Sequence, residues 1–171
     1  MSPPAFLSGI KDGIVIDIGG TNTDIGALAH GFPRESSVEV GGVRTNFRMP
    51  DVHSFGLGGG SIVTAHGALT IGPRSVGSEL HRQARVFGGQ VLTATDIAVA
   101  VGLAEVGDRA LVADLDAKLV QGALALMKQR VEDAIDRVKL TRGDVPVILV
   151  GGGGILLDGA LAGASQVGRP C

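Results

Sequence analysis

Tryptophan and tyrosine are absent from this chain of 171 residues, and aromatic residues make up only 3% of it. Without large aromatic side chains, the hydrophobic core must consist mainly of Val, Ile, Leu and Ala. Such cores suit α/β proteins, in which helices cover the faces of a sheet. With 44% hydrophobic and 19% charged residues, the composition is that of an ordered globular domain rather than a disordered chain.

Other absences exclude whole classes of protein. The single cysteine, Cys171, excludes an intramolecular disulfide framework and a cysteine-based metal site, and we assign it no nucleophilic role. No apolar run reaches the ~18–20 residues of a membrane span, and residues 1–7 lack the features of a signal peptide. We therefore expect a cytoplasmic protein without a membrane contact. The formal net charge is −2, without a basic stripe, so nothing indicates a nucleic-acid partner.

Glycine, by contrast, is abundant, with 28 residues against an average usage of about 7%. The glycines gather in pairs and triplets at turns, which excludes collagen-like and low-complexity sequences. Three clusters adjoin apolar runs. We name them the first glycine loop (residues 19–22), the second glycine loop (58–61) and the third glycine loop (151–154).

The first glycine loop lies between two apolar runs, which predicts strand, tight turn and strand over residues 13–18 and 24–30. Its glycines let the backbone approach a ligand closely, and the polar residues after them supply donors for phosphate oxygens. Asp17, at the end of the first strand, is suited to hold a hydrated Mg²⁺. A plain turn would explain the Gly-Gly pair by itself. The acid before the pair and the Thr-x-Thr-Asp sequence that ends at Asp24 favour phosphate binding instead. The expected phosphate contacts are Gly19, Gly20, Thr21, Asn22 and Thr23.

The other two glycine loops are less specific. The third follows a predicted strand over residues 147–150 and precedes a predicted apolar helix over residues 155–164, so it suits either a flat or anionic ligand or a close packing turn. The second opens a predicted hairpin over residues 61–71 and either lines the same cleft or only makes the turn. The candidate ligand-facing residues are Gly58, Gly59, Gly60, Ser61, Gly151, Gly152, Gly153 and Gly154.

The remaining polar residues stay undecided. Arg74 and Ser75 suit a phosphate or substrate contact as well as a solvated loop. Thr95 and Asp96 fit the cap of a short helix over residues 93–102 first and an active-site acid second. The histidines have no metal-like spacing, and we interpret them as turn or surface residues: His53, His66 and His81.

Periodicity predicts the rest of an α/β fold. Apolar residues recur every three to four positions over residues 114–139, which predicts a long helix. Residues 36–47 alternate in part and suit a third strand, interrupted at two glycines, of an antiparallel meander. Pro50 suits the first turn of a short helix.

The first glycine loop resembles the phosphate loop of the actin, sugar-kinase and heat-shock-chaperone superfamily. That resemblance implies a ribonuclease H-like lobe with a mixed sheet, into which the predicted β-hairpin is inserted. The loop is neither a Walker A motif, because it lacks Gly-Lys-Ser/Thr, nor a Rossmann fingerprint, because a strand follows it.

Several segments together resemble one family, the ATP-dependent hydantoinases and 5-oxoprolinases, specifically hydantoinase A-type subunits. The resemblance covers nearly the whole chain and implies ATP- and Mg²⁺-dependent opening of a five-membered cyclic amide, with ATP phosphorylating the amide oxygen. It implies a Mg²⁺-binding role for Asp17, an orienting role for Asp24 and an adenosine-facing third glycine loop. The matching segments are Asp-Ile-Gly-Gly-Thr-Asn-Thr-Asp (17–24), Gly-Gly-Gly-Ser (58–61), Ile-Gly-Pro-Arg-Ser-Val-Gly (71–77) and Phe-Gly-Gly-Gln-Val-Leu-Thr-Ala-Thr-Asp (87–96).

Members of that family are longer and carry an earlier lobe with its own glycine loop. We therefore expect residues 1–171 to form the later lobe of a two-lobed protein, and to be inactive alone. The implied partners are the missing lobe, a hydantoinase B-type subunit and a small cyclic amide. Two alternatives remain open: a sugar-type small-molecule kinase lobe, for which we find no sugar-binding acid, and a non-catalytic nucleotide-binding assembly domain.

Overall fold

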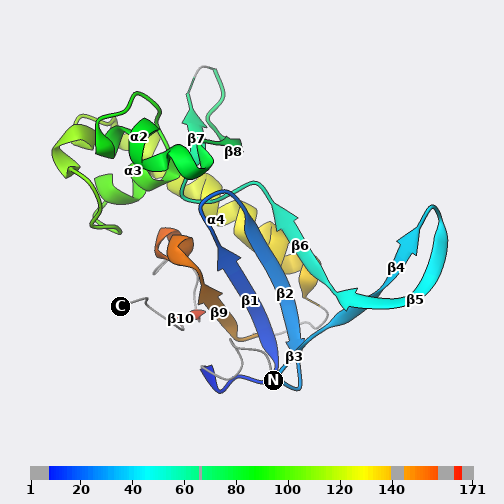
Figure 1. Cartoon of the computed structure of the whole chain (residues 1–171). Coiled ribbons are helices and arrows are strands. Elements are labelled where there is room, and N and C mark those ends of the chain that lie inside the picture. Colours follow the sequence, from blue (N-terminus) through cyan, green and yellow to red (C-terminus); the bar gives the residue numbers. More distant parts are fainter. Residues whose placement is uncertain (1–7, 66, 140–144, 158–163, 167–171) are drawn as a thin grey trace.

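A mixed β-sheet carries the first and third glycine loops at one of its ends (Figure 1). The computed structural model describes residues 8–65, 67–139, 145–157 and 164–166. The central strand is β1 (Gly13–Ile18), which pairs with β2 (Thr23–Ala29) in antiparallel fashion and with β9 (Val147–Val150) in parallel. All three strands were predicted to within two residues, because each contains an apolar run next to a glycine turn.

Short strands complete the two edges of this sheet. β10 (Ala164–Gln166) lies parallel to β9. On the other side, β3 (Phe32–Pro33) and β6 (Val52–Phe55) share one edge of β2, and both are antiparallel to it. The chain is thus an α/β protein with a mixed sheet, as expected.

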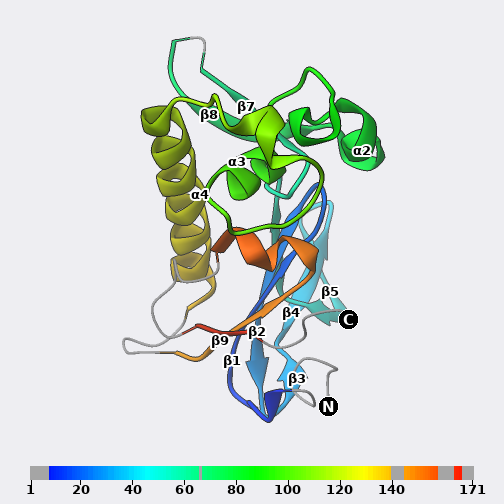
Figure 2. The ribbon, with the colours of Figure 1, turned by 90° about the vertical axis from the view of Figure 1, so that its left-hand side faces the viewer.

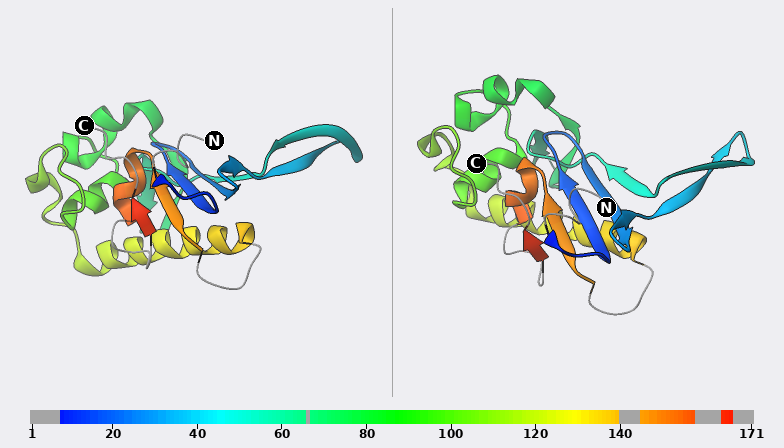
Figure 3. Two further views of the ribbon diagram at one scale, coloured as in Figure 1. Left: turned by 90° about the horizontal axis from the view of Figure 1, so that it is seen from below. Right: turned by 60° about the horizontal axis from the view of Figure 1, so that its bottom comes forward.

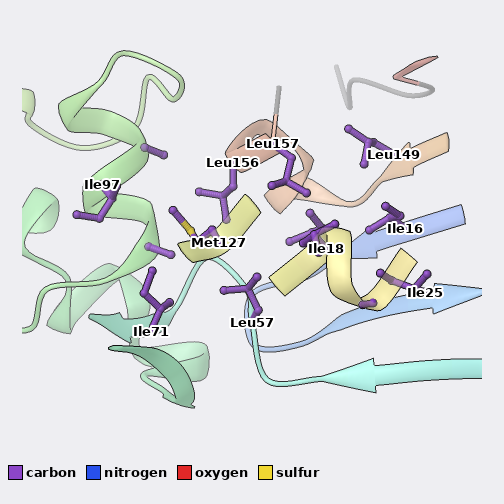
Figure 4. Packing of buried hydrophobic residues seen from close by; sticks show 14 of the residues in the cluster. Ile16, Ile18, Ile25, Leu57, Ile71, Ile97, Met127, Leu149, Leu156 and Leu157 are labelled. Carbon is purple, nitrogen blue, oxygen red and sulfur yellow. The ribbon is translucent and has the colours of Figure 1, made fainter. Parts of the chain in front are cut away.

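The long helix α4 (Ala117–Val138) covers one face of the sheet, as Figure 3 shows. Asp116 caps its N-terminus by accepting hydrogen bonds from the N–H groups of Lys118 (2.6 Å) and Leu119 (3.2 Å), which satisfies two of the free donors of a helix end. Its apolar stripe packs on the alternate residues of β1 and β2 that point the same way. Met127 of α4 lies in one cluster with Ile16, Ile18 and Ile25 of the sheet (Figure 4).

A second group of short elements lies beyond the glycine-loop end of the sheet. It comprises β7 (Ser61–Thr64), β8 (Thr70–Ser75), η1 (Gly77–Glu79), α2 (Leu80–Gln83), η2 (Arg85–Phe87), α3 (Ala94–Ala100) and η3 (Arg109–Val112). The β7–β8 hairpin and α3 were both expected. The 3₁₀-helix η4 (Gly152–Leu157) follows β9 and lies between α3 and the sheet (Figure 2).

Three local predictions were wrong. Residues 36–47 do not form one interrupted strand of the sheet: β4 (Glu35–Val40) and β5 (Val43–Pro50) form a separate hairpin that projects from the body in both views of Figure 3. Gly41 and Gly42 adopt φ values of 60° and 82°, so they make its turn. Pro50 ends β5 rather than opening a helix, and β6 supplies the expected third antiparallel strand.

The third wrong prediction concerns residues 155–164. The helix after the third glycine loop is a 3₁₀-helix that begins inside the loop, at Gly152, and residue 164 already belongs to β10. Residues 158–163 lie outside the described part of the chain. No helix within the described residues is long and apolar enough to cross a membrane.

Candidate functional site

The three glycine loops, which are far apart in the sequence, meet at one pocket of about 290 Å³. The sheet brings the first and third loops together, because β1 and β9 are parallel neighbours and both end at this side. The second loop arrives from β6 through Leu57, which is buried in the core. The loop residues that line the pocket are Gly19, Gly20, Gly59, Gly152 and Gly153.

The first glycine loop presents unused backbone donors at its tip. The Gly19 N–H donates to the Asn22 carbonyl oxygen (2.9 Å), which closes the turn. Among the described residues, the N–H groups of Gly20, Thr21 and Asn22 donate no hydrogen bond to the protein, and both polar side chains are exposed. Successive N–H groups of this kind form an anion-binding concavity.

The second glycine loop lies against the first, and its N–H groups donate hydrogen bonds to the first loop or to partners within the second loop itself. The N–H groups of Gly59 and Gly60 donate to the carbonyl oxygens of Gly19 (3.1 Å) and Gly20 (2.7 Å). The Gly58 N–H donates to the buried hydroxyl of Ser61 at 2.9 Å. Of this loop, only Gly59 lines the pocket. Its geometry therefore favours support of the first loop over direct ligand contact.

Thr23 occupies a similar supporting position. Its side chain is fully buried, and its hydroxyl donates to the Leu57 carbonyl oxygen at 2.6 Å. The hydroxyl that the sequence offered to phosphate is thus engaged within the protein. It fixes the approach of the second loop to the end of β2.

Asp17 and Asp24 lie directly opposite each other in the β1–β2 register. Opposed residues of an antiparallel pair project from the same face of the sheet, here the face away from α4, and both carboxylates are exposed. The Ser54 hydroxyl donates to Asp24, but neither aspartate forms an ion pair with any described residue. Two facing carboxylates repel each other, so the pair is suited to a cation.

Gly151 links the aspartate pair to the pocket. It has a φ of 82°, and a Cβ at this position would lie against the Asp17 carboxylate and the Ile18 carbonyl oxygen. Only glycine meets both demands without strain. The next residue, Gly152, already lines the pocket, so the aspartates flank the same end of the sheet.

Asp96 is buried and serves as the acid of a capping box at the start of α3. One carboxylate oxygen accepts from the Val86 N–H (2.7 Å), and the other accepts from the N–H (2.7 Å) and hydroxyl (2.8 Å) of Thr93. The helix-cap interpretation is therefore confirmed for Asp96, with Thr93 as the N-cap. Thr95 donates its hydroxyl to the Gly59 carbonyl oxygen (2.9 Å) and lines the pocket.

The remaining candidates lie apart from the pocket. Ser75 accepts a hydrogen bond from the Gly77 N–H (3.0 Å), and Arg74 is exposed. His53 stacks on Phe55, His81 faces the Ser78 carbonyl oxygen, and His66 lies outside the described residues. The described chain holds no group of three or more His, Cys, Asp and Glu side chains that suits a metal ion.

The apolar side of the pocket was not predicted from the sequence. It is formed by Leu80, Phe87, Ala98, Ala104, Val106, Ile155 and Leu156. These residues come from five separate segments: α2, η2, α3, the segment after α3 and η4. Their position around a pocket, rather than their type, marks them as candidate ligand contacts.

Comparison with known proteins places this chain in a family. The sequence profile of the hydantoinase/oxoprolinase family matches residues 4–107, which include the first two glycine loops and α3. The chain belongs to the hydantoinase/oxoprolinase family. The "Caprolactamase subunit alpha" of Pseudomonas jessenii is 34% identical over 133 residues, which are 74% of this chain and 17% of that protein.

Solved structures extend the similarity over most of the chain. The crystal structure of the ATP-dependent caprolactamase from Pseudomonas jessenii matches 86% of this chain, with a TM-score of 0.65 and 26% identity. A nucleotide-free structure of an acetone carboxylase, which acts in ATP-dependent acetone carboxylation, matches 89% with the same TM-score and 19% identity, which shows a shared fold alone. The chain spans 26% of each of these relatives.

Proposed function

We propose that this chain is the nucleotide-binding lobe of an ATP-dependent cyclic amidase that opens hydantoin- or 5-oxoproline-like rings. The observation that carries the proposal is the convergence of three glycine loops on one pocket, at the same end of the sheet as Asp17 and Asp24, which form no ion pair with any described residue. Membership of the hydantoinase/oxoprolinase family and the similarity to an ATP-dependent caprolactamase support this reaction class over a sugar-type kinase.

In this proposal the phosphates of ATP lie against free N–H groups of two loops. The first loop supplies those of Gly20, Thr21 and Asn22, and the third loop supplies those of Gly152 and Gly153, at the start of η4. Among the described residues, none of these groups has a protein acceptor. Backbone donors held in this way need little reorganisation when phosphate arrives. The second loop and Thr23 keep the first loop in shape.

Asp17 and Asp24 suit Mg²⁺ because this ion usually binds to one or two carboxylates, with water and phosphate oxygens completing its octahedron. The absence of a third acidic ligand among the described residues agrees with that preference. When bound, the ion neutralises the charge of the phosphates. Asp17 holds it, and Asp24, fixed by Ser54, orients the first loop or the attacking group.

The proposed reaction overcomes the low reactivity of an amide toward water by phosphorylating it first. The γ-phosphoryl group passes from ATP to the amide oxygen, which leaves ADP and an activated ring carbon. Water then adds to that carbon, the C–N bond opens and phosphate leaves. Phosphoryl transfer of this kind depends on positioning and charge neutralisation rather than on a strong protein nucleophile, which matches a site without an unpaired nucleophilic side chain among its described pocket residues.

The proposal also concerns the rest of the protein. The antiparallel β1, β2 and β6, the helix α4 and the parallel β9 follow the order expected for a ribonuclease H-like lobe. The relatives are several times longer than this chain, which supports a second lobe that completes the clamp around ATP. The name "subunit alpha" of the caprolactamase relative supports a partner subunit, here of the hydantoinase B type. We place the protein in the cytoplasm.

Substitution of Gly58 by alanine tests how the second loop supports the first. The new Cβ would lie 2.6–2.7 Å from backbone atoms of Gly19, Gly20 and Thr21, so the first loop must move. We expect a loss of about 1–3 kcal/mol in the free energy of unfolding, as for other overpacked sites, and ATP binding weakened about tenfold or more. Gly26→Ala is the control, because its Cβ meets only Asp51 and Val52 at 3.4–3.6 Å. Equal effects of the two substitutions contradict the supporting role.

The reaction itself is tested on the native protein, purified with its partner subunit. The protein is incubated with ATP, Mg²⁺ and one cyclic amide at a time (hydantoin, 5-oxoproline or caprolactam). ADP and the ring-opened product are then quantified in the same sample. We expect equal amounts of both from at least one ring. Formation of ADP together with a stable phosphorylated product would favour a kinase, and nucleotide binding without ADP would favour an assembly domain.

A further inference from the structure

The apolar half of the glycine-loop pocket holds side chains that the protein itself leaves uncovered. Phe87 is 38% exposed, Val106 43% and Ile155 41%, and all three line this pocket. They come from η2, from the segment after α3 and from η4, so three separate parts of the fold present apolar surface to one space. Exposed apolar side chains in a concave site usually mark a ligand-binding site.

The same half of the pocket lacks side chains that could read a ligand by hydrogen bonding. Among the described residues that line the pocket, Thr95 is the only one with a polar side chain, and its hydroxyl already donates to Gly59. The neighbouring Asp96 is buried and accepts three hydrogen bonds from Val86 and Thr93. No carboxylate, amide or guanidinium of the described lining faces the space.

We propose that this apolar half holds the base of the nucleotide by surface contact alone, so that the protein accepts adenine, guanine and hypoxanthine nucleotides alike. The inference rests on the proposed function and adds the class of nucleotide. Sites that bind a polar group by hydrogen bonds reject an analogue by about 10⁴–10⁵-fold, whereas apolar pockets discriminate by only about 10–200-fold. Stacking and apolar contact tolerate different bases because every base has a flat face.

The volume of the pocket agrees with a ligand whose base and sugar lie inside it and whose phosphates extend out of it. At about 290 Å³, it is at the small end of ligand sites, which usually span about 300–1,000 Å³. It therefore has room for part of a nucleotide. The base and sugar lie against Phe87, Val106 and Ile155, and the phosphates extend toward the first and third glycine loops.

The test compares ligands that differ only in the base. The native protein is titrated calorimetrically with the Mg²⁺ complexes of ATP, GTP, ITP and inorganic tripolyphosphate. We expect Kd values for the three nucleotides within about tenfold of one another, and tripolyphosphate at least about tenfold weaker. GTP and ITP more than about 200-fold weaker than ATP, beyond what apolar contact alone can discriminate, would overturn the inference but leave the proposed function intact. Tripolyphosphate as tight as ATP would overturn only the placement of the base, and absence of all binding would overturn both proposals.

A substitution separates contact by the base from contact by the phosphates. Phe87→Ala should weaken ATP, GTP and ITP by a common factor of about tenfold without changing the affinity for tripolyphosphate. Phe32→Ala is the matched control, because Phe32 is 58% exposed on β3 and does not line the pocket. Ile155→Ala repeats the test from the opposite wall if Phe87→Ala lowers the melting temperature. Loss of affinity for one base only would show that the pocket reads the base edge.

Discussion

Asp17→Asn is expected to lower ATP turnover by at least about 1,000-fold, which corresponds to about 4 kcal/mol of transition-state stabilisation. The substitution keeps the shape of the side chain but removes the negative charge that faces Asp24 across the β1–β2 pair. The proposed Mg²⁺ site then loses the carboxylate that would hold the ion, and the phosphates lose part of the charge neutralisation that phosphoryl transfer requires. The effect should appear in kcat more than in the affinity for the cyclic amide.

The fold should survive this change, because Asp17 is exposed and forms no ion pair with a described residue. Removal of one of two facing carboxylates also relieves repulsion, so the melting temperature in the absence of Mg²⁺ should stay the same or rise. Asp133→Asn is the matched control: Asp133 is exposed on α4 and lies outside the glycine-loop pocket. Wild-type ATP hydrolysis by Asp17→Asn would remove the residue from the site.

Asp96→Ala should have the largest effect on stability, a loss of about 3–5 kcal/mol in the free energy of unfolding measured by urea denaturation. The substitution leaves the N–H group of Val86 and both donors of Thr93 without their acceptor in a fully buried place. It also removes the capping box of α3. Phe87 and Thr95 line the pocket and are the chain neighbours of Val86 and Asp96. We therefore expect both pocket residues to become more mobile as well.

Two further variants separate burial from capping. Asp96→Asn keeps one acceptor oxygen and should lose about 1–3 kcal/mol. Asp108→Ala removes an exposed cap, since Asp108 accepts only from the Ala110 N–H at 2.9 Å, and should lose about 1 kcal/mol or less. An Asp96→Ala protein as stable as Asp108→Ala would contradict the role of the buried carboxylate.

Local patterns were enough to predict the elements with strong periodicity. β1, β9 and α4 lie within a few residues of their predicted bounds, because a buried strand needs a continuous apolar run and a packed helix needs a stripe at every third or fourth residue. The cap of α3 was predicted only in part: Asp96 belongs to it as expected, but Thr93 rather than Thr95 is the N-cap residue. The phosphate-binding role of the first glycine loop, by contrast, stays a prediction from its residue types.

Local patterns failed where the structure of a segment depends on the strand with which it pairs. Residues 35–50 form a projecting hairpin instead of a strand of the sheet, because β6 occupies the place beside β2. Alternation alone predicts a strand but not its partner. Similarly, the apolar residues after the third glycine loop suggest a helix of ordinary length, but the chain forms the short η4 before returning as β10.

The sequence by itself determined which residue types are available at the site: flexible glycines, small donors and two aspartates at fixed positions along the chain. Only the tertiary structure decided which of them line the pocket. Gly58, Gly60, Ser61 and Thr23 are as suitable for phosphate as their neighbours, yet they hold the first loop from behind. Phe87, Val106 and Ile155, which the sequence analysis did not single out as ligand contacts, form the apolar wall of the pocket. The physical reason is that a hydrogen bond depends on direction and access, and both are set by how separate segments pack together.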